Sequence, residues 1–236
     1  MTGKPPLLSL ALTALALALA GCSGLFRSDA KPEQTYVLRA PVAKAQGPAT
    51  APAASDGSAT PATPAPGSAA PLAVLQVAHP LAAPGLDGPH IMLVQADHRM
   101  NFYLGSRWPA PLPDVVEALA ADTLRASGEW QSIEDSGSPF PPQYLLQISV
   151  RRFDADYTRG GGAPTVEVVL DCTLGARTGS ELIASFVAEG TAQASGDRMS
   201  EVVDAFARAS DAAFTSLAQQ TSSGARAFAE RAAAGH

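Results

Sequence analysis

Histidine and cysteine side chains are the first candidates for metal binding or acid–base chemistry in this chain. Zinc sites need three or four ligands at characteristic short spacings, usually from histidine, cysteine and carboxylate residues. The four histidines have no paired spacing and join no cluster of cysteine or carboxylate residues; they are His79, His90, His98 and His236. We therefore expect no metal site and no bound cofactor.

Three polar motifs are further candidates for catalytic or ligand-binding sites. Asp97 and His98 are adjacent, so on a strand they would point to opposite faces, and no GxSxG nucleophile turn accompanies them. The run RGGG at 159–162 lacks the Lys-Ser/Thr of a P-loop and suits a hairpin loop. A mixed-sign patch suits a solvated rim or a contact surface; it comprises Arg151, Arg152, Asp154 and Asp156. We therefore expect no catalytic residue.

The N-terminus has the residue order of a secretory signal peptide: Lys4, an apolar stretch over 7–20, and then small residues. Its apolar core is too short for a stable membrane span. Residues 19–22 (LAGC) resemble the bacterial lipobox. In that motif, cleavage between the positions of Gly21 and Cys22 follows diacylglyceryl transfer to the thiol and precedes acylation of the new amino group. An ordinary signal peptide with a chance cysteine is the alternative.

A lipobox at Cys22 would make residues 1–21 a removed signal peptide and tether the mature chain to a bilayer. Several acyl chains, at about 0.8 kcal/mol per buried methylene, make a stable anchor. Ser23 follows the cysteine in place of the Asp that commonly retains bacterial lipoproteins in the inner membrane. This resemblance favours the periplasmic face of the outer membrane. Cys172 would then have no disulfide partner, and its apolar neighbours predict a small buried side chain.

Charge is scarce and unevenly placed. Of the 236 residues only 16% are charged, against roughly 25% in a typical domain, and the formal net charge is −6. The deficit lies in residues 5–26 and 41–71. A negative chain without a cluster of Lys and Arg is unsuited to phosphate backbones, so nucleic acid is excluded as a partner.

Residues 41–71 are dominated by Ala, Pro, Gly, Ser and Thr. Such a segment buries too little apolar surface to offset its conformational entropy, which predicts disorder. Its role depends on the β-prone run at 35–40. If that run pairs with the downstream sheet, 41–71 is a loop within one domain and the tether is only 22–34. If the run stays unpaired, the tether extends to Pro71 and 41–71 is a spacer.

Residues 72–220 predict one α+β domain, followed by a flexible tail over 221–236. Apolar and alternating runs predict strands at 72–77, 91–96, 100–104, 144–150, 166–174 and 182–188. Pro113 and Gly128 bracket a helix over 112–126, and Asp197 is a plausible N-cap for a second helix over 197–219. We expect one mainly antiparallel sheet with two principal helices on one face, preceded by a lipidated flexible N-terminus.

The order of these features resembles the ABC-type transport auxiliary lipoproteins, the paraquat-inducible-type lipoproteins that accompany MCE-domain lipid transport systems. The resemblance covers roughly 22–40 and 72–220. The Ala/Pro-rich insertion departs from the compact pattern of the family. The matching elements are the lipobox at Cys22, YVL at 36–38, FYLGSRWPAPL at 102–112, SGEW at 127–130, YLL at 144–146 and VDAF at 203–206.

This resemblance implies a non-enzymatic lipoprotein that docks an MCE-type assembly driven by an inner-membrane ABC transporter, with 36–38 as the first strand. Self-association is a family-level option that the composition leaves open. Arg107 and Trp108 are the candidate partner contact, because exposed Trp and Arg are enriched at binding hot spots. Alternatively, Trp108 fastens the helix N-terminus to the sheet. The competing function is a free-standing lipoprotein that binds a ligand or modifies the envelope.

Overall fold

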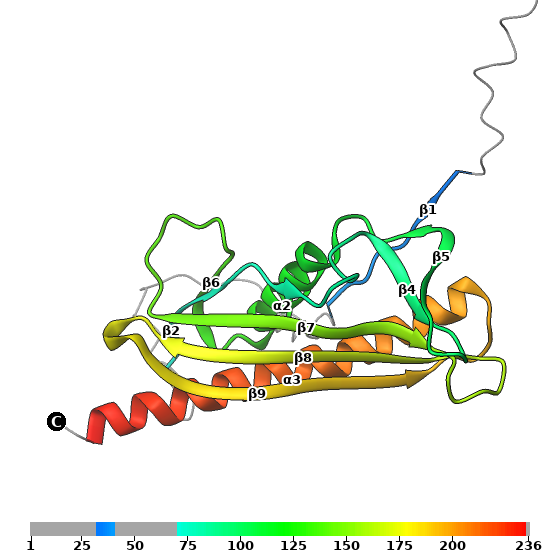
Figure 1. The fold of residues 1–236 in the computed structure, drawn as a ribbon. Coiled ribbons are helices and arrows are strands. Elements are labelled where there is room, and N and C mark those ends of the chain that lie inside the picture. Colours follow the sequence, from blue (N-terminus) through cyan, green and yellow to red (C-terminus); the bar gives the residue numbers. More distant parts are fainter. Residues whose placement is uncertain (1–31, 41–69, 235–236) are drawn as a thin grey trace, which may run out of the picture. The chain divides into compact units, whose positions relative to one another are not determined.

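The computed structural model describes residues 32–40 and 70–234 (Figure 1). Its sheet is organised around strand β7 (Tyr144–Asp156), which pairs with other strands along both of its edges. The predicted signal peptide, Cys22, Ser23 and most of the Ala/Pro-rich segment lie outside the described residues. The chain from Gln34 onward forms one unit by its internal contacts. Alternate residues of β7 are apolar and buried, which is the pattern of a strand with one face on the core.

One edge of β7 carries a long antiparallel meander. Strand β8 (Thr165–Ala176) pairs with β7 along its whole length, from Tyr144 opposite Ala176 to Asp156 opposite Thr165. Strand β9 (Glu181–Gln193) then pairs with β8, also antiparallel. Short hairpin connections suffice for such neighbours.

The other edge of β7 is shared by three short parallel strands in succession: β2 (Leu72–Val77), β3 (Leu81–Ala82) and β4 (His90–Val94). Strand β6 (Trp130–Glu134) extends the sheet beyond β2, in parallel. Strand β5 (Met100–Arg107) extends it beyond β4, antiparallel, and β1 (Gln34–Thr35) lies outside β5. The sheet is therefore mixed: the long ladders are antiparallel as expected, and most of the short ones are parallel.

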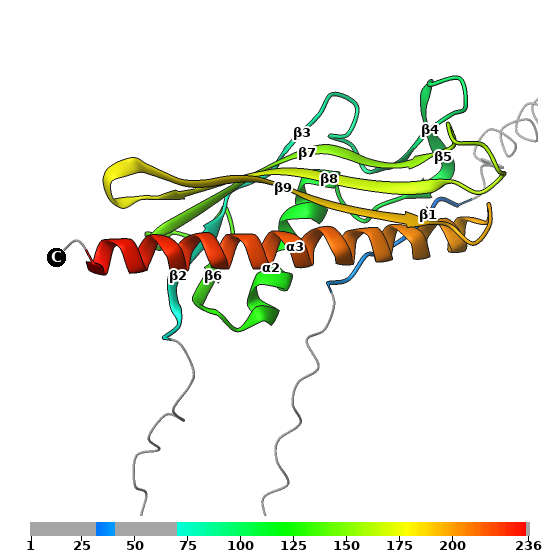
Figure 2. The ribbon, with the colours of Figure 1, turned by 90° about the horizontal axis from the view of Figure 1, so that it is seen from below.

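Two principal helices lie on one side of this sheet (Figure 2). Helix α2 (Leu112–Ser127) has Pro113 in its first turn and ends at Gly128, whose φ of 66° is the left-handed conformation of a helix C-cap. Helix α3 (Met199–Ala234) runs along β8 and β9. The predicted α+β class with two helices covering one sheet is confirmed.

Helix α3 extends well past the predicted boundary, so the expectation of a flexible tail after Thr221 is wrong as far as Ala234. Ser222 and Ala225 are buried in this extension. The Trp130 Nε1–H donates a hydrogen bond to Ser222 Oγ at 3.1 Å, and the Tyr144 ring lies 6.4 Å from that of Phe228. These contacts hold the last turns of α3 against β6 and β7.

The start of α3 also differs in detail from the expectation. The Arg198 backbone N–H donates to the Glu201 carboxylate at 3.1 Å, which is half of a capping box and makes Arg198 the capping position. Asp197 instead accepts a hydrogen bond from the Tyr157 hydroxyl. Asp197 therefore joins the helix start to the end of β7.

The predicted core positions of β7 and β8 are all buried. Cys172 is among them, and its burial raises the pKa of the thiol to about 12, with Asp171 contributing. It behaves as a small apolar side chain. The same alternation fails at one end of β9, where Leu182 is 62% exposed. Leu174 pairs with Ala184 but Gly175 pairs with Leu182, so a bulge at Ile183 moves Leu182 to the other face.

Residues 34–40 belong to the same unit as the rest of the sheet. Gln34 pairs with Ser106 and Thr35 with Arg107, and the Tyr36 N–H donates to the Arg107 carbonyl at 2.9 Å. The strand is shorter than the predicted run at 35–40, because residues 36–40 leave the sheet edge and bury Leu38 against α2. Residues 41–69 therefore connect two parts of one unit.

Candidate contact surface around the β5–α2 loop

The loop between β5 and α2 holds Trp108, one of the two predicted contact residues. Its side chain is 1% exposed, and its ring packs edge-on against Phe153 at 5.9 Å and Phe206 at 5.3 Å. The Trp108 N–H donates to the Pro89 carbonyl at 2.8 Å. The ring thus joins the loop to β7 and α3.

This burial corrects the expectation that Trp108 contacts a partner, because its ring has no accessible surface to offer. The geometry matches the alternative, in which Trp108 fastens the start of α2 to the sheet. Arg107 is half-buried, and its Nε–H donates to the Trp108 carbonyl at 3.4 Å. Sequence reasoning could not separate the two roles, because a Trp beside an Arg in a loop has no periodicity that reveals its burial.

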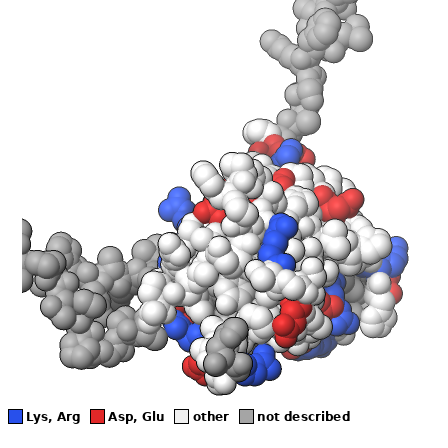
Figure 3. Space-filling view, turned by 90° about the vertical axis from the view of Figure 1, so that its left-hand side faces the viewer, with Lys and Arg blue, Asp and Glu red and all other residues white. Residues whose placement is uncertain are grey.

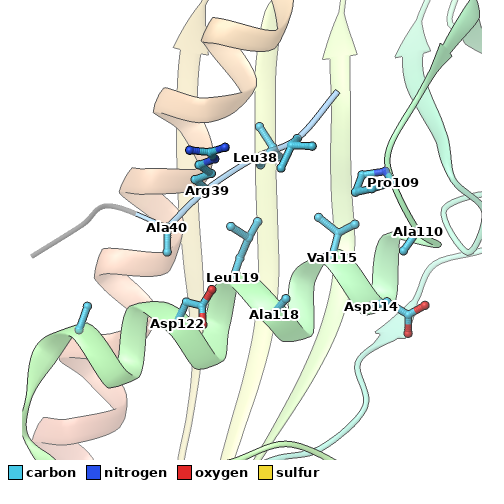
Figure 4. A pocket seen from close by; sticks show the side chains of 12 residues that line it. Leu38, Arg39, Ala40, Pro109, Ala110, Asp114, Val115, Ala118, Leu119 and Asp122 are labelled. Atoms are coloured by element: carbon cyan, nitrogen blue, oxygen red, sulfur yellow. The ribbon is translucent and has the colours of Figure 1, made fainter. Parts of the chain in front are cut away.

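An open groove of about 650 Å³ lies beside this loop (Figure 4). Its walls come from three places: segment 37–40, the loop at Pro109 and Ala110, and one face of α2. The floor is apolar, with Leu38, Val115 and Leu119 directed into it (Figure 4). The groove exists because residues 36–40 cross α2 after leaving β1. Nothing in the sequence pattern of 36–40 signals that crossing.

Charge in the groove is confined to its margin. Arg39, Asp114 and Asp122 are exposed, whereas Val115 and Leu119 beneath them are buried. The free-standing ligand-binding alternative predicts a deep pocket lined by convergent polar groups. The groove is instead open and mainly apolar, which suits an apolar segment of another macromolecule better than a small polar ligand.

The mixed-sign patch predicted around 151–156 is a network across β7 and β8. Arg152 contacts the carboxylates of Asp154 at 2.9 Å, Asp156 at 3.2 Å and also Glu167. The hydrogen bonds to Asp154 raise the pKa of the Arg152 guanidinium. Burial alone would raise the pKa of Asp156, but hydrogen bonds from Thr158 and Arg152 outweigh it and hold that pKa below its ordinary value. The network links the two strands by their side chains.

The other polar motifs occupy turns. His98 has a φ of 64° in the β4–β5 turn, and Asp97 pairs with Arg99 at 2.6 Å. The three glycines at 160–162 all have positive φ in the β7–β8 turn. Among the described residues, no group of three or more His, Cys, Asp or Glu side chains could hold a metal ion.

Figure 3 views the end of the molecule that lies at the left of Figure 1. On that surface, basic and acidic side chains are interspersed.

No helix in the described part of the chain is long and apolar enough to cross a membrane.

A family model matches residues 56–220, which include strands β2 to β9, helix α2 and most of α3. Its description is "ABC-type transport auxiliary lipoprotein component". The chain belongs to this family. Members of the ABC-type transport auxiliary lipoprotein family are lipoproteins that accompany a transporter, so the chain is a transport auxiliary lipoprotein.

The fold has a precedent in one of the solved structures to which the chain is similar. Protein XCC0632 from Xanthomonas campestris, of the DUF330 family, has a TM-score of 0.65 at 22% identity, over 85% of this chain and 99% of that one. A putative lipoprotein from Caulobacter crescentus CB15 has a TM-score of 0.37 at 14% identity (66% and 91% coverage). A PelC dodecamer from Paraburkholderia phytofirmans has a TM-score of 0.36 at 17% identity (64% and 92%). No curated protein matches the chain.

Proposed function

We propose that this auxiliary lipoprotein is a non-enzymatic docking component of an MCE-type intermembrane lipid transport system. The observation that carries the proposal is the family match over 56–220 to a transport auxiliary lipoprotein, on a fold whose described groove is apolar and open. Docking needs a surface that excludes water, which an apolar groove with a charged margin provides. Docking of this kind requires no catalytic side chain.

The anchor in this proposal is Cys22, acylated on its sulfur and its amino group after cleavage at Gly21. Pairing of Gln34 with Ser106 supports the short tether of 22–34, because the chain joins the sheet there. Twelve peptide steps from Cys22 to Gln34 span at most about 43 Å when fully extended. The domain would therefore stay close to its membrane. Ser23 supports the outer membrane, with the domain in the periplasm.

The groove beside the β5–α2 loop is the surface that we assign to the MCE-domain protein. Ala118 faces this groove from α2, is exposed, and offers a place for a photocrosslinking residue. Leu182 in β9 is the matched control, because it is an exposed apolar residue outside the groove. A crosslink to the MCE-domain protein from position 118, absent from position 182, is the expected result.

The proposal also makes two predictions that can be tested in the cell. Genes for an ABC permease, an ATPase and an MCE-domain protein are expected beside the gene for this chain, and deletion is expected to weaken the outer-membrane barrier to detergents and large antibiotics. Absence of all three genes, together with an intact barrier after deletion, would argue for the free-standing alternative.

Self-association of the lipoprotein is compatible with this role. The mass of the detergent-extracted protein, measured by light scattering, gives the number of copies in each particle.

A further inference from the structure

The edge strand β5 carries an exposed apolar surface that the docking role does not explain. We name as the β5 apolar strip the side chains of Met100, Phe102 and Leu104, which are 51%, 37% and 86% exposed. Residues 100–106 (MNFYLGS) include no charged residue. Edge strands are usually protected by charge, and exposed apolar surface of this kind marks an interaction site.

A large bulge presents Leu104 to the outside. His90 pairs with Arg107 and Met92 with Phe102, so β5 has three more residues than β4 between these two pairs. Gly105 makes the bulge possible, because its φ of 69° is a left-handed conformation that other residues rarely adopt.

Hydrogen bonding fixes which side chains of the bulge point outward. The Tyr103 hydroxyl lies 2.8 Å from that of Tyr157, which in turn donates to Asp197 at the start of α3. Tyr103 is therefore held inward, while Phe102 and Leu104 on either side of it stay exposed. Phe102 is steadied by stacking on His90, at 4.5 Å between ring centroids.

The bulge also indicates what kind of partner this edge accepts. Within residues 32–40 and 70–234, β5 pairs on its outer side only through Ser106 and Arg107, with β1. A bulged edge is a poor template for another strand, because its N–H and C=O groups are out of register. Protruding apolar side chains on an irregular edge suit a fluid apolar medium instead.

The position of the tether identifies that medium. Gln34 pairs with Ser106, two residues from Leu104, so the tether from Cys22 joins the domain beside the β5 apolar strip. We propose that the β5 apolar strip lies in the interfacial region of the bilayer that holds the Cys22 anchor. This inference rests on the lipid anchor of the proposed function. The strip then orients the domain on the membrane and leaves the opposite end of the sheet in the periplasm.

The test uses the lipidated full-length chain with Leu104→Cys, reconstituted in vesicles of phosphatidylethanolamine and phosphatidylglycerol. Acylation occupies Cys22 and burial protects Cys172, so the new thiol is the one that a fluorescent maleimide labels. The matched control is Leu182→Cys in β9, level with the opposite end of β7 and roughly 30 Å away along the strand direction. Both positions are exposed, so neither substitution disturbs the core.

The expected result is quenching of the label at position 104 by lipids with a nitroxide on the acyl chain, at a depth of roughly 5–10 Å. The label at position 182 should remain accessible to aqueous iodide. Equal iodide access at both positions in vesicles would overturn the inference and leave the anchor intact. Protection of position 104 only at high protein-to-lipid ratio, or only with a second protein, would overturn it in favour of a protein contact. Failure of the chain to float with the vesicles would remove the anchor and therefore both proposals.

Discussion

The ring of Trp108 meets the ring of Phe206 at 5.3 Å and an angle of 81°, which joins the β5–α2 loop to helix α3. Phe153 of β7 completes the cluster by stacking on Phe206 at 5.5 Å. Edge-to-face aromatic pairs contribute beyond their buried area. The aromatic cluster thus holds the β5–α2 loop, β7 and α3 together at one point. Because that loop forms one wall of the groove, the cluster also fixes the position of that wall.

Replacing Trp108 by alanine should lower the free energy of unfolding by about 3–5 kcal/mol, because it leaves a cavity among Phe153, Phe206 and the start of α2. Urea unfolding followed by circular dichroism measures the change. Leu182→Ala is the control and should stay within about 0.5 kcal/mol, since that side chain is exposed. A Trp108→Ala protein as stable as the control would show that the ring is a surface contact after all.

The C-terminal extension of α3 should contribute to stability through the buried hydrogen bond from Trp130 to Ser222. Ser222→Ala leaves the indole N–H without its acceptor and should cost about 1–3 kcal/mol. Ser223→Ala is the matched control, because Ser223 is the exposed neighbour in the same helix. Equal urea midpoints for the two variants would contradict a structural role for the last turns.

Gly190 is required by the close approach of β9 and α3. A Cβ built at this position would lie 1.8 Å from the backbone carbonyl oxygen of Ala209, closer than any contact tolerates. Gly190→Ala should therefore force β9 and α3 apart and cost about 3 kcal/mol or more. Thermal unfolding tests this against Glu189→Ala, an exposed neighbour. Unchanged melting of Gly190→Ala would mean that the strand and helix are further apart than described.

Acid should destabilise the fold through Asp156 and Glu117. For each carboxyl, burial alone would raise the pKa, but hydrogen bonds outweigh it and lower the pKa; the donors are Thr158 and Arg152 for Asp156, and Ser136 and His79 for Glu117. The folded chain then binds fewer protons than the unfolded chain near these values, so stability falls as pH decreases.

The stabilisation from these two carboxylates is fully present above the ordinary pKa values of 3.8 and 4.5, and it is lost as pH falls through the lower folded-state values. Denaturant unfolding at pH 7, 5, 4 and 3 measures it. Asp156→Asn and Glu117→Gln should each flatten the decline. A decline unchanged in both variants would assign it to other carboxylates.

The lipobox makes a separate prediction about location. Cys22→Ala removes the thiol that receives the diacylglyceryl group, so the protein should move from the membrane pellet to the periplasmic fraction. Ser23→Ala is the control and should stay in the pellet. Membrane fractionation of Cys22→Ala that matches the parent chain would remove the basis for a lipid anchor.

The strands with one buried face were predictable because their residues alternate. Tyr144 to Val150 and Val166 to Leu174 follow the pattern, and their inward-facing alternate residues are buried as expected. The sharing of one edge of β7 by β2, β3 and β4 was not predictable. Parallel neighbours are joined by long connections, which carry no local turn signal.

The ends of the chain were harder to interpret for a different reason. The run SSG at 222–224 has low helix propensity, so the local sequence predicts that the helix ends near Thr221. The helix continues through this run because of tertiary contacts: Ser222 accepts a hydrogen bond from Trp130, and the ring of Phe228 packs against that of Tyr144. The bulge at Ile183 is likewise set by pairing with β8. Pairing between distant segments leaves no trace in local composition.

Crosslinking in native membranes tests the central claim most directly. A photocrosslinking residue at position 118 in the groove, with the same residue at 182 as control, is activated in cells before the chain is purified through an affinity tag. The account predicts an adduct with the MCE-domain protein from position 118 alone. Recovery of the chain by itself, or the same adducts from both positions, would contradict docking through this surface.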